Sequence, residues 1–214
     1  MAAERPVIYV LAGVNGAGKS SVGGHLLTRA GLAWFDPDAF ARALRAAAPG
    51  LDATAANAAA WTEGMRRLDA ALAAGTSHAF ETTLGGRSVP ARLRAASRTH
   101  DVLVWFCGLA TPELHLARVR ARVAAGGHPI AEPKIRERWH SARANLIALL
   151  PDLAELRLFD NSASVAPGAP VPDPLPLALI RHGRLLWPAA DDLAPLAATP
   201  AWARPVLEAA LRAG

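Results

Sequence analysis

The stretch that most constrains the fold of this chain is YVLAGVNGAGKSSVGGHLL, residues 9–27. Residues 13–20 read GVNGAGKS and match the pattern GxxxxGK[ST], between an apolar run typical of a strand and a segment with helical spacing. Glycines let such a loop curl until its N–H groups point inward at phosphate oxygens, and the following helix adds its positive end. We therefore predict a phosphate-binding loop made of Gly13, Asn15, Gly16, Ala17, Gly18, Lys19, Ser20 and Ser21.

Two residues of this loop predict what it binds. Lys19 would reach the β and γ phosphates of a nucleotide, and the Ser20 hydroxyl would ligate Mg²⁺. Lysine occurs only at positions 19 and 134, since every other cationic side chain is an arginine. A chain that so rarely uses lysine has one inside this motif, so we expect ATP and Mg²⁺ as cofactors.

Composition predicts one globular domain over residues 1–214, because 52% of the residues are hydrophobic and 19% are charged. The sequence contains no apolar run long enough to cross a bilayer, and Glu4, Arg5 and Pro6 break any signal-peptide pattern. The single cysteine, Cys107, lies inside the apolar run VLVWFCGL and is typical of a buried structural thiol. We expect a cytoplasmic protein with no membrane partner.

Apolar runs alternate with alanine-rich helical segments, which predicts an α/β fold with a mostly parallel sheet covered on both faces. The expected strands lie at 7–13, 32–36, 77–82, 101–109 and 156–161. The expected helices lie at about 19–30, 37–48, 53–74, 88–98, 112–125 and 132–149. Near the C-terminus, LALIRHGRLLW predicts a small hairpin followed by a helix, within about 176–212.

The loop motif is shared by transporters, switches and kinases, so other residues must decide the reaction. An ABC-type transporter ATPase needs a strand that ends in Asp-Glu, whereas the run DVLVWFCGLA ends without an acid. A GTPase needs an NKxD-type sequence, which the chain lacks. The net charge of +5 suits anionic ligands, but the arginines lack interleaved aromatics, so we do not expect nucleic-acid binding.

A kinase needs a base near the acceptor hydroxyl, and acidic residues follow two of the expected strands. In WFDPDAF, Asp36 and Asp38 lie where a strand ends and a helix begins. Asp36 is either a helix N-cap or a substrate contact, and Asp38 is the better candidate for the base. In SHAFETTL, Glu81 ends a strand and is followed by Thr82 and Thr83, which we expect at the substrate side of the site.

A kinase also needs cations and a lid that excludes water. Residues 114–146 form an arginine-dense helix, a Gly126-Gly127 hinge and a second basic helix, which predicts a lid over about 115–140. Arg118 and Arg122 share one helical face and are expected to be catalytic, and Arg136 is expected to contact substrate. For any single arginine of this cluster the sequence favours a solvated surface charge, whereas for the cluster as a whole it favours a lid.

The order of motifs along the chain resembles that of the zeta toxin family of P-loop kinases, through about residue 162. These motifs are GxNGAGKS, FxDPDxFA, FETTLGG, RVxxGGHxI, KIRERW and LFDNS. The resemblance implies a sheet order of 2-3-1-4-5 and phosphorylation of UDP-N-acetylglucosamine at its 3′ hydroxyl. It also implies that Asp38 is the general base, Lys19 the phosphate lysine, Ser20 the magnesium ligand, and Glu81 and Thr83 substrate-side residues.

The chain departs from the family at His128-Pro129, where the toxins keep a second lid arginine, and at ETT, where they read EGT. Arg118, Arg122 or Arg136 could supply the missing cation. We predict an ATP-dependent kinase acting on a hydroxyl of a small molecule. The alternative is an ATP-binding or ATPase regulatory module that works through a protein partner; a toxin role would require an antitoxin-like partner encoded elsewhere.

Overall fold

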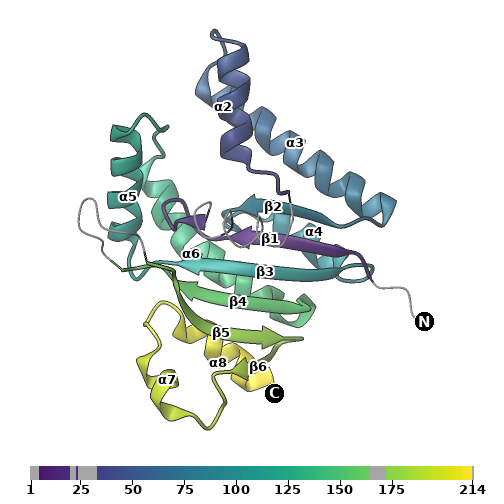
Figure 1. Ribbon diagram of the computed structural model, residues 1–214, viewed down its shortest axis with the longest axis vertical. Helices are drawn as coiled ribbons and strands as arrows, with labels where there is room; N and C mark the ends of the chain where they lie inside the picture. The colour runs from purple at the N-terminus through teal and green to yellow at the C-terminus, as the bar shows by residue number, and fades with distance from the viewer. Residues whose placement is uncertain (1–4, 20–22, 24–32, 164–171, 214) are drawn as a thin grey trace.

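The computed structural model describes residues 5–19, 23, 33–163 and 172–213 (Figure 1). Its centre is a six-stranded sheet of order β2-β1-β3-β4-β5-β6, in which the first four strands of that order run parallel and the last two are antiparallel to their neighbours. The strands are β1 (Val7–Ala12), β2 (His78–Thr82), β3 (Asp101–Gly108), β4 (Glu155–Asp160), β5 (Leu175–Arg181) and β6 (Arg184–Trp187).

The structure confirms the α/β P-loop fold and corrects the predicted sheet at both edges. The strand predicted over 32–36 is a single bridge, at which Phe35 lies parallel to Phe80 of β2. Counting this segment, the parallel part keeps the expected 2-3-1-4-5 order. At the other edge, the predicted hairpin pairs through β5 with β4 and so extends the main sheet.

Several helices begin at a residue whose side chain caps the helix. The structure has α2 (Pro37–Ala47), α3 (Ala53–Ala74), α4 (Ser88–Ala96), α5 (Pro112–Ala124), α6 (Glu132–Leu149), a short 3₁₀ turn η1 (Leu150–Asp152), α7 (Leu193–Ala198) and α8 (Arg204–Ala213). The Asp52 carboxylate caps the start of α3, and Gly75, at φ 63°, ends it in the left-handed conformation that glycine adopts without strain. The helix predicted over 19–30 lies almost entirely outside the described residues.

Helices α4, α6 and α8 lie behind the sheet in Figure 1, and α6 contacts both of the others. Cys107 of β3 is fully buried, which confirms the structural thiol, and burial raises its pKa to about 12. In the part of the chain that is described, no helix combines the length and apolar character that a bilayer crossing requires. The layer of α4, α6 and α8 brings residues of α6 to the carboxyl ends of β1 and β2, where the predicted site residues lie.

Candidate active site

The loop after β1 has the backbone geometry that its glycines allow. Gly13, Gly16 and Gly18 have φ of 143°, 83° and 83°, a region that residues with a side chain rarely adopt. A β-carbon on Gly16 would lie only 2.9 Å from the carbonyl oxygen of His115, so the loop also packs too closely for a larger residue. Ser20 and Ser21, predicted to hold Mg²⁺ and phosphate, lie outside the described residues.

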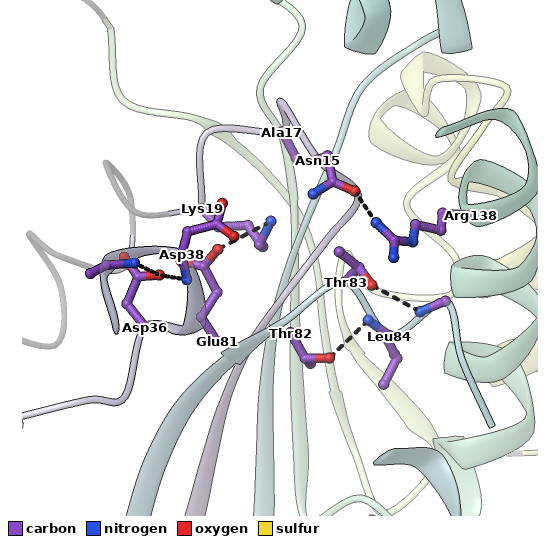
Figure 2. A network of polar contacts seen from close by, with 12 residues as sticks. Asn15, Ala17, Lys19, Asp36, Asp38, Glu81, Thr82, Thr83, Leu84 and Arg138 are labelled. Carbon is purple, nitrogen blue, oxygen red and sulfur yellow. Dashed lines mark hydrogen bonds and ion pairs between the residues drawn. The ribbon is translucent and has the colours of Figure 1, made fainter. Parts of the chain in front are cut away.

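Lys19 lies at the end of this loop and pairs with Glu81. Its Nζ is 3.3 Å from Glu81 Oε1, and both side chains are about nine-tenths buried (Figure 2). Glu81 reaches this position because β2 lies beside β1 in register, with Leu11 opposite Glu81. A buried cation and anion each cost free energy unless paired, so the pair holds Lys19 in place without a ligand.

Asp36 and Asp38 have different surroundings at the start of α2. Asp36 Oδ1 accepts hydrogen bonds from the N–H groups of Asp38 (2.8 Å) and Ala39 (3.1 Å), so Asp36 is the N-cap of the helix (Figure 2). Asp38 is one residue inside the helix and its carboxylate lies 3.3 Å from Arg122. Of the two acids, Asp38 is therefore the one whose side chain faces other predicted site residues.

The three predicted arginines go to three different places. Arg122 of α5 bonds Asp38 Oδ2 and the carbonyl of His128, while its Nε is buried and has no partner among the described residues. Arg118 donates to the carbonyls of Asn161 (2.7 Å) and Ala163 (3.1 Å), and burial lowers the pKa of its guanidinium. Only Arg122 therefore contacts the candidate base.

Arg136 lies away from this group, on the exposed side of α6. Its guanidinium pairs with Glu113 (2.7 Å) and with Glu132 (2.8 Å), and these two carboxylates raise its pKa. Exposed ion pairs of this kind stabilise the fold little, but they occupy the guanidinium of Arg136, which does not line the cavity described below.

Arg138, which the sequence analysis did not single out, is the cation of α6 that reaches the loop. Its Nη1 donates to Asn15 Oδ1 at 2.8 Å, and Asn15 is buried at 7% exposure (Figure 2). Burial lowers the pKa of Arg138 from its ordinary value, but a guanidinium remains charged at neutral pH. The spacing in KIRERW places Arg136 and Arg138 on different faces of the helix, but it does not indicate which face lies toward the loop.

Asn161 and His115 also support the loop and were missed. Asn161, from the LFDNS segment after β4, donates from Nδ2 to the carbonyl of Ala17 at 2.8 Å. The Nδ1 of His115 lies 2.9 Å from the carbonyl oxygen of Asn15, which can only accept, so Nδ1 carries the proton. Both side chains thus hold carbonyl groups of the loop in place.

Thr82 and Thr83 shape the turn after β2. Thr82 Oγ1 accepts from the N–H of Leu84 at 3.1 Å, and Thr83 Oγ1 accepts from the N–H of Gly85 at 3.5 Å (Figure 2). Leu84 has a φ of 56°, which is unusual for a residue with a side chain. The turn is held by α6, whose Asn145 donates to the carbonyls of Leu84 and Gly86.

Part of this set lines one cavity of about 600 Å³. Its polar lining includes Asn15, Lys19, Asp38, Glu81, Thr82, Thr83 and Arg138, together with Asn57, Ser88, His128, Lys134 and Glu137. Its apolar wall is Phe35, Trp61, Met65, Phe80, Val89 and Ile130. Trp61 of α3 is 51% exposed, an unusual position for so large an apolar side chain. The cavity thus combines a phosphate-type lysine, a carboxylate and an apolar surface, as small-molecule sites commonly do.

Residues 8–149 match the family AAA_33, described as an AAA domain, and this match covers most of the chain. The chain belongs to this family. A protein of Haemophilus influenzae Rd, described as uncharacterized, is 38% identical over 61 residues, which are 28% of this chain and 44% of that protein. The chain therefore matches less than half the length of that relative.

Solved structures share the fold at low sequence identity. The complex of AvrRxo1-ORF1 with AvrRxo1-ORF2 and sulphate ions has a TM-score of 0.63 at 17% identity, over 98% of this chain and 80% of that chain. The PezAT toxin–antitoxin system of Streptococcus pneumoniae has a TM-score of 0.55 at 12% identity, over 74% and 68%. A protein of Chloroflexus aurantiacus J-10-fl, provisionally described as a kinase, has 0.52 at 18%, over 64% and 78%. These likenesses show the P-loop kinase fold.

Proposed function

We propose that this protein is an ATP-dependent phosphotransferase that transfers the γ-phosphoryl group to a hydroxyl of a small molecule. The observation that carries the proposal is that Lys19 and Asp38 line the same cavity of about 600 Å³. A phosphate-binding lysine and a carboxylate that line one cavity are two of the groups that phosphoryl transfer to a hydroxyl uses.

The transfer would proceed by in-line displacement. The acceptor oxygen bonds to the γ-phosphorus, the bond from that phosphorus to the β–γ bridging oxygen breaks, and ADP leaves. The acceptor proton goes to a carboxylate oxygen of Asp38. Lys19 would leave its contact with Glu81 and bind oxygens of the β and γ phosphates, where it would stabilise the negative charge that develops during transfer.

Two arginines are positioned to support this step. Arg138 lines the cavity and is held by Asn15, so it would offer a cation on the α6 side. Arg122 holds the Asp38 carboxylate from the α5 side. Mg²⁺, when bound with ATP through the Ser20 hydroxyl, would neutralise phosphate charge, and carboxylate and hydroxyl oxygens are the donors that it prefers. The lid proposed over about 115–140 includes α5 and the start of α6, which carry these two arginines.

We further propose a nucleotide sugar such as UDP-N-acetylglucosamine as the first acceptor to test. The proposal rests on the resemblance of the GxNGAGKS and FxDPDxFA motifs to the zeta toxin family, from which the chain departs at ETT and at His128-Pro129. It is supported by an apolar wall on which a flat ring could pack, with Trp61 half exposed beside Met65.

A second candidate is an ATP-binding module that acts through a protein partner. It is favoured by the AvrRxo1-ORF1:-ORF2 complex with ATP, which has a TM-score of 0.60 at 16% identity over 86% of this chain and 60% of that chain. That complex and the PezAT system each join two proteins. Such a partner would be an antitoxin-like protein.

The variant Asp38→Asn separates the two candidates. Removing the base should lower kcat by about 10²–10⁴-fold while leaving the ATP dissociation constant within about twofold, as measured by mass spectrometry of products and by calorimetry. Asp36→Asn is the matched control, because asparagine still accepts the cap hydrogen bonds. If Asp38→Asn kept full transfer, Asp38 would not be the base. If no panel of sugars and nucleotide sugars raised ATP consumption, the second candidate would replace the first.

A further inference from the structure

A second cavity, of about 270 Å³, lies on the other side of Asp38. It is enclosed by helix α2 and by the segment in which α5 ends, Arg122 to His128. Asp38, Asn57 and His128 line both cavities, so the two meet at the proposed base.

The lining of this second cavity is strongly basic. Arg42 and Arg45 follow Asp38 by four and seven residues, so all three lie on one face of α2. At 1.5 Å of rise per residue, the two arginines lie about 6 Å and about 10 Å from Asp38 along the helix axis. Arg122 faces them from α5, while Gly126 and Gly127 add no side chains.

These arginines have unused capacity for an anion. Neither Arg42 nor Arg45 belongs to any ion pair formed within the described ranges, whereas Glu63, Glu132 and Glu155 each pair with two arginines. The one acidic side chain in the lining, Asp38, already pairs with Arg122. The Nε of Arg122 is buried and lacks a partner among the residues described.

We infer that this cavity is a subsite for an anionic group of the phosphoryl acceptor, which extends the proposed function by naming the acceptor's charge. The acceptor carries a phosphate or a carboxylate on the side of Asp38 where Arg42 and Arg45 line the second cavity. Guanidinium groups bind both anions through paired N–H donors, which explains three arginines at one small cavity.

Anion binding can be tested without any acceptor. The full chain is saturated with Mg²⁺ and a non-hydrolysable ATP analogue, which occupies the loop, and inorganic phosphate or acetate is titrated by calorimetry. Arg42→Gln/Arg45→Gln should weaken phosphate or acetate binding at least tenfold. Arg98→Gln/Arg184→Gln, which removes two exposed arginines away from the cavity, should change it less than twofold. Equal binding by the two double variants overturns the subsite.

Kinetics then test whether the anion belongs to the acceptor. Matched sets of a polyol, its monophosphate and its carboxylic acid are compared as acceptors. One anionic member should have the lower KM, and its advantage over the neutral member should fall at least tenfold in Arg42→Gln/Arg45→Gln. If all members are phosphorylated and the advantage of the anionic member does not fall in the variant, the protein is a kinase but the second cavity is not an anion subsite. If the variant loses phosphate binding but no member is phosphorylated by the wild type, the anion site is supported and the proposed kinase activity is rejected.

Discussion

At the scale of single residues, Asp36 and Asp38 show how position on a helix decides the task of a carboxylate. Asp36 precedes α2 and its oxygen accepts two backbone hydrogen bonds, whereas Asp38 lies within the helix and its side chain is left to contact Arg122. The letters DPD left Asp36 as either a cap or a substrate contact, and its hydrogen bonds make it the cap. The second carboxylate is therefore the one available for chemistry.

His115 gives a prediction at the same scale. It is 1% exposed, and burial is the main cause that lowers its pKa to about 4, so it is neutral at pH 7. The unfolded chain binds a proton at His115 near pH 6.5, before the folded protein does, so stability falls as the pH drops from about 6.5 towards 4. We expect a loss of about 2–3 kcal/mol in the free energy of unfolding between pH 7 and pH 4.5 from this residue.

The measurement is urea unfolding at the two pH values for the wild type and for His115→Asn. Asparagine can donate from Nδ2 to the Asn15 carbonyl but does not titrate in this range. The variant should therefore lose less stability on acidification. His78, whose pKa is also lowered by burial, contributes to both proteins alike. An equal pH dependence in the two proteins would mean that His115 is not buried as a neutral group.

At the scale of elements, α6 joins the parts of the site. From one helix, Arg138 reaches the loop after β1, while Ser141 and Asn145 bond the carbonyls of the turn after β2. The site therefore depends on the register of α6 as much as on the two strands.

Asn145→Ala should release the turn at Leu84. The variant loses two hydrogen bonds, to the carbonyls of Leu84 and Gly86. The first of these helps to keep Leu84 in its left-handed backbone conformation. We expect a loss of about 1–2 kcal/mol in the free energy of unfolding and a higher KM for the acceptor. Arg136→Gln, on the same helix but in exposed ion pairs, should cost less than about 1 kcal/mol. Urea denaturation gives the free energy of unfolding and initial rates give the KM of each variant. Equal changes in Asn145→Ala and Arg136→Gln would contradict the role of Asn145.

The sequence predicted elements better than contacts. The helices predicted over 53–74 and 132–149 have those bounds because Asp52, Gly75 and the Pro-bearing start of α6 mark them locally. The strand over 32–36 was overestimated, since in the described part of this range Phe35 alone forms a bridge to β2, and its ring lies beside Gly64 of α3. Arg136 was preferred to Arg138 because both lie in one basic helix, and only the packing of α6 on the sheet decides which faces the loop.

At the scale of the whole molecule, the C-terminal segment completes the sheet. Strand β5 covers the edge of β4, and Trp202, only 3% exposed, packs against Gly108 at the end of β3. Its ring lies 6.2 Å from that of Phe106, and its Nε1 donates to Asp160 Oδ1 at 2.9 Å. Through Trp202, these contacts join the segment that leads into α8 to the carboxyl ends of β3 and β4.

Trp202→Ala should therefore destabilise the whole sheet. Loss of a buried tryptophan costs about 3–5 kcal/mol, and Trp202→Phe, which keeps a ring but not the bond to Asp160, should cost less. Because residues 175–181 pair directly with β4, unfolding should remain one cooperative transition, shifted to lower urea in both variants. The transition is followed by circular dichroism and by tryptophan fluorescence. The unfolding is repeated with ATP, which should stabilise the part that binds it. Two separate transitions, of which the one stabilised by ATP keeps its urea midpoint in Trp202→Ala, would instead show that the C-terminal segment unfolds independently of the kinase-like sheet.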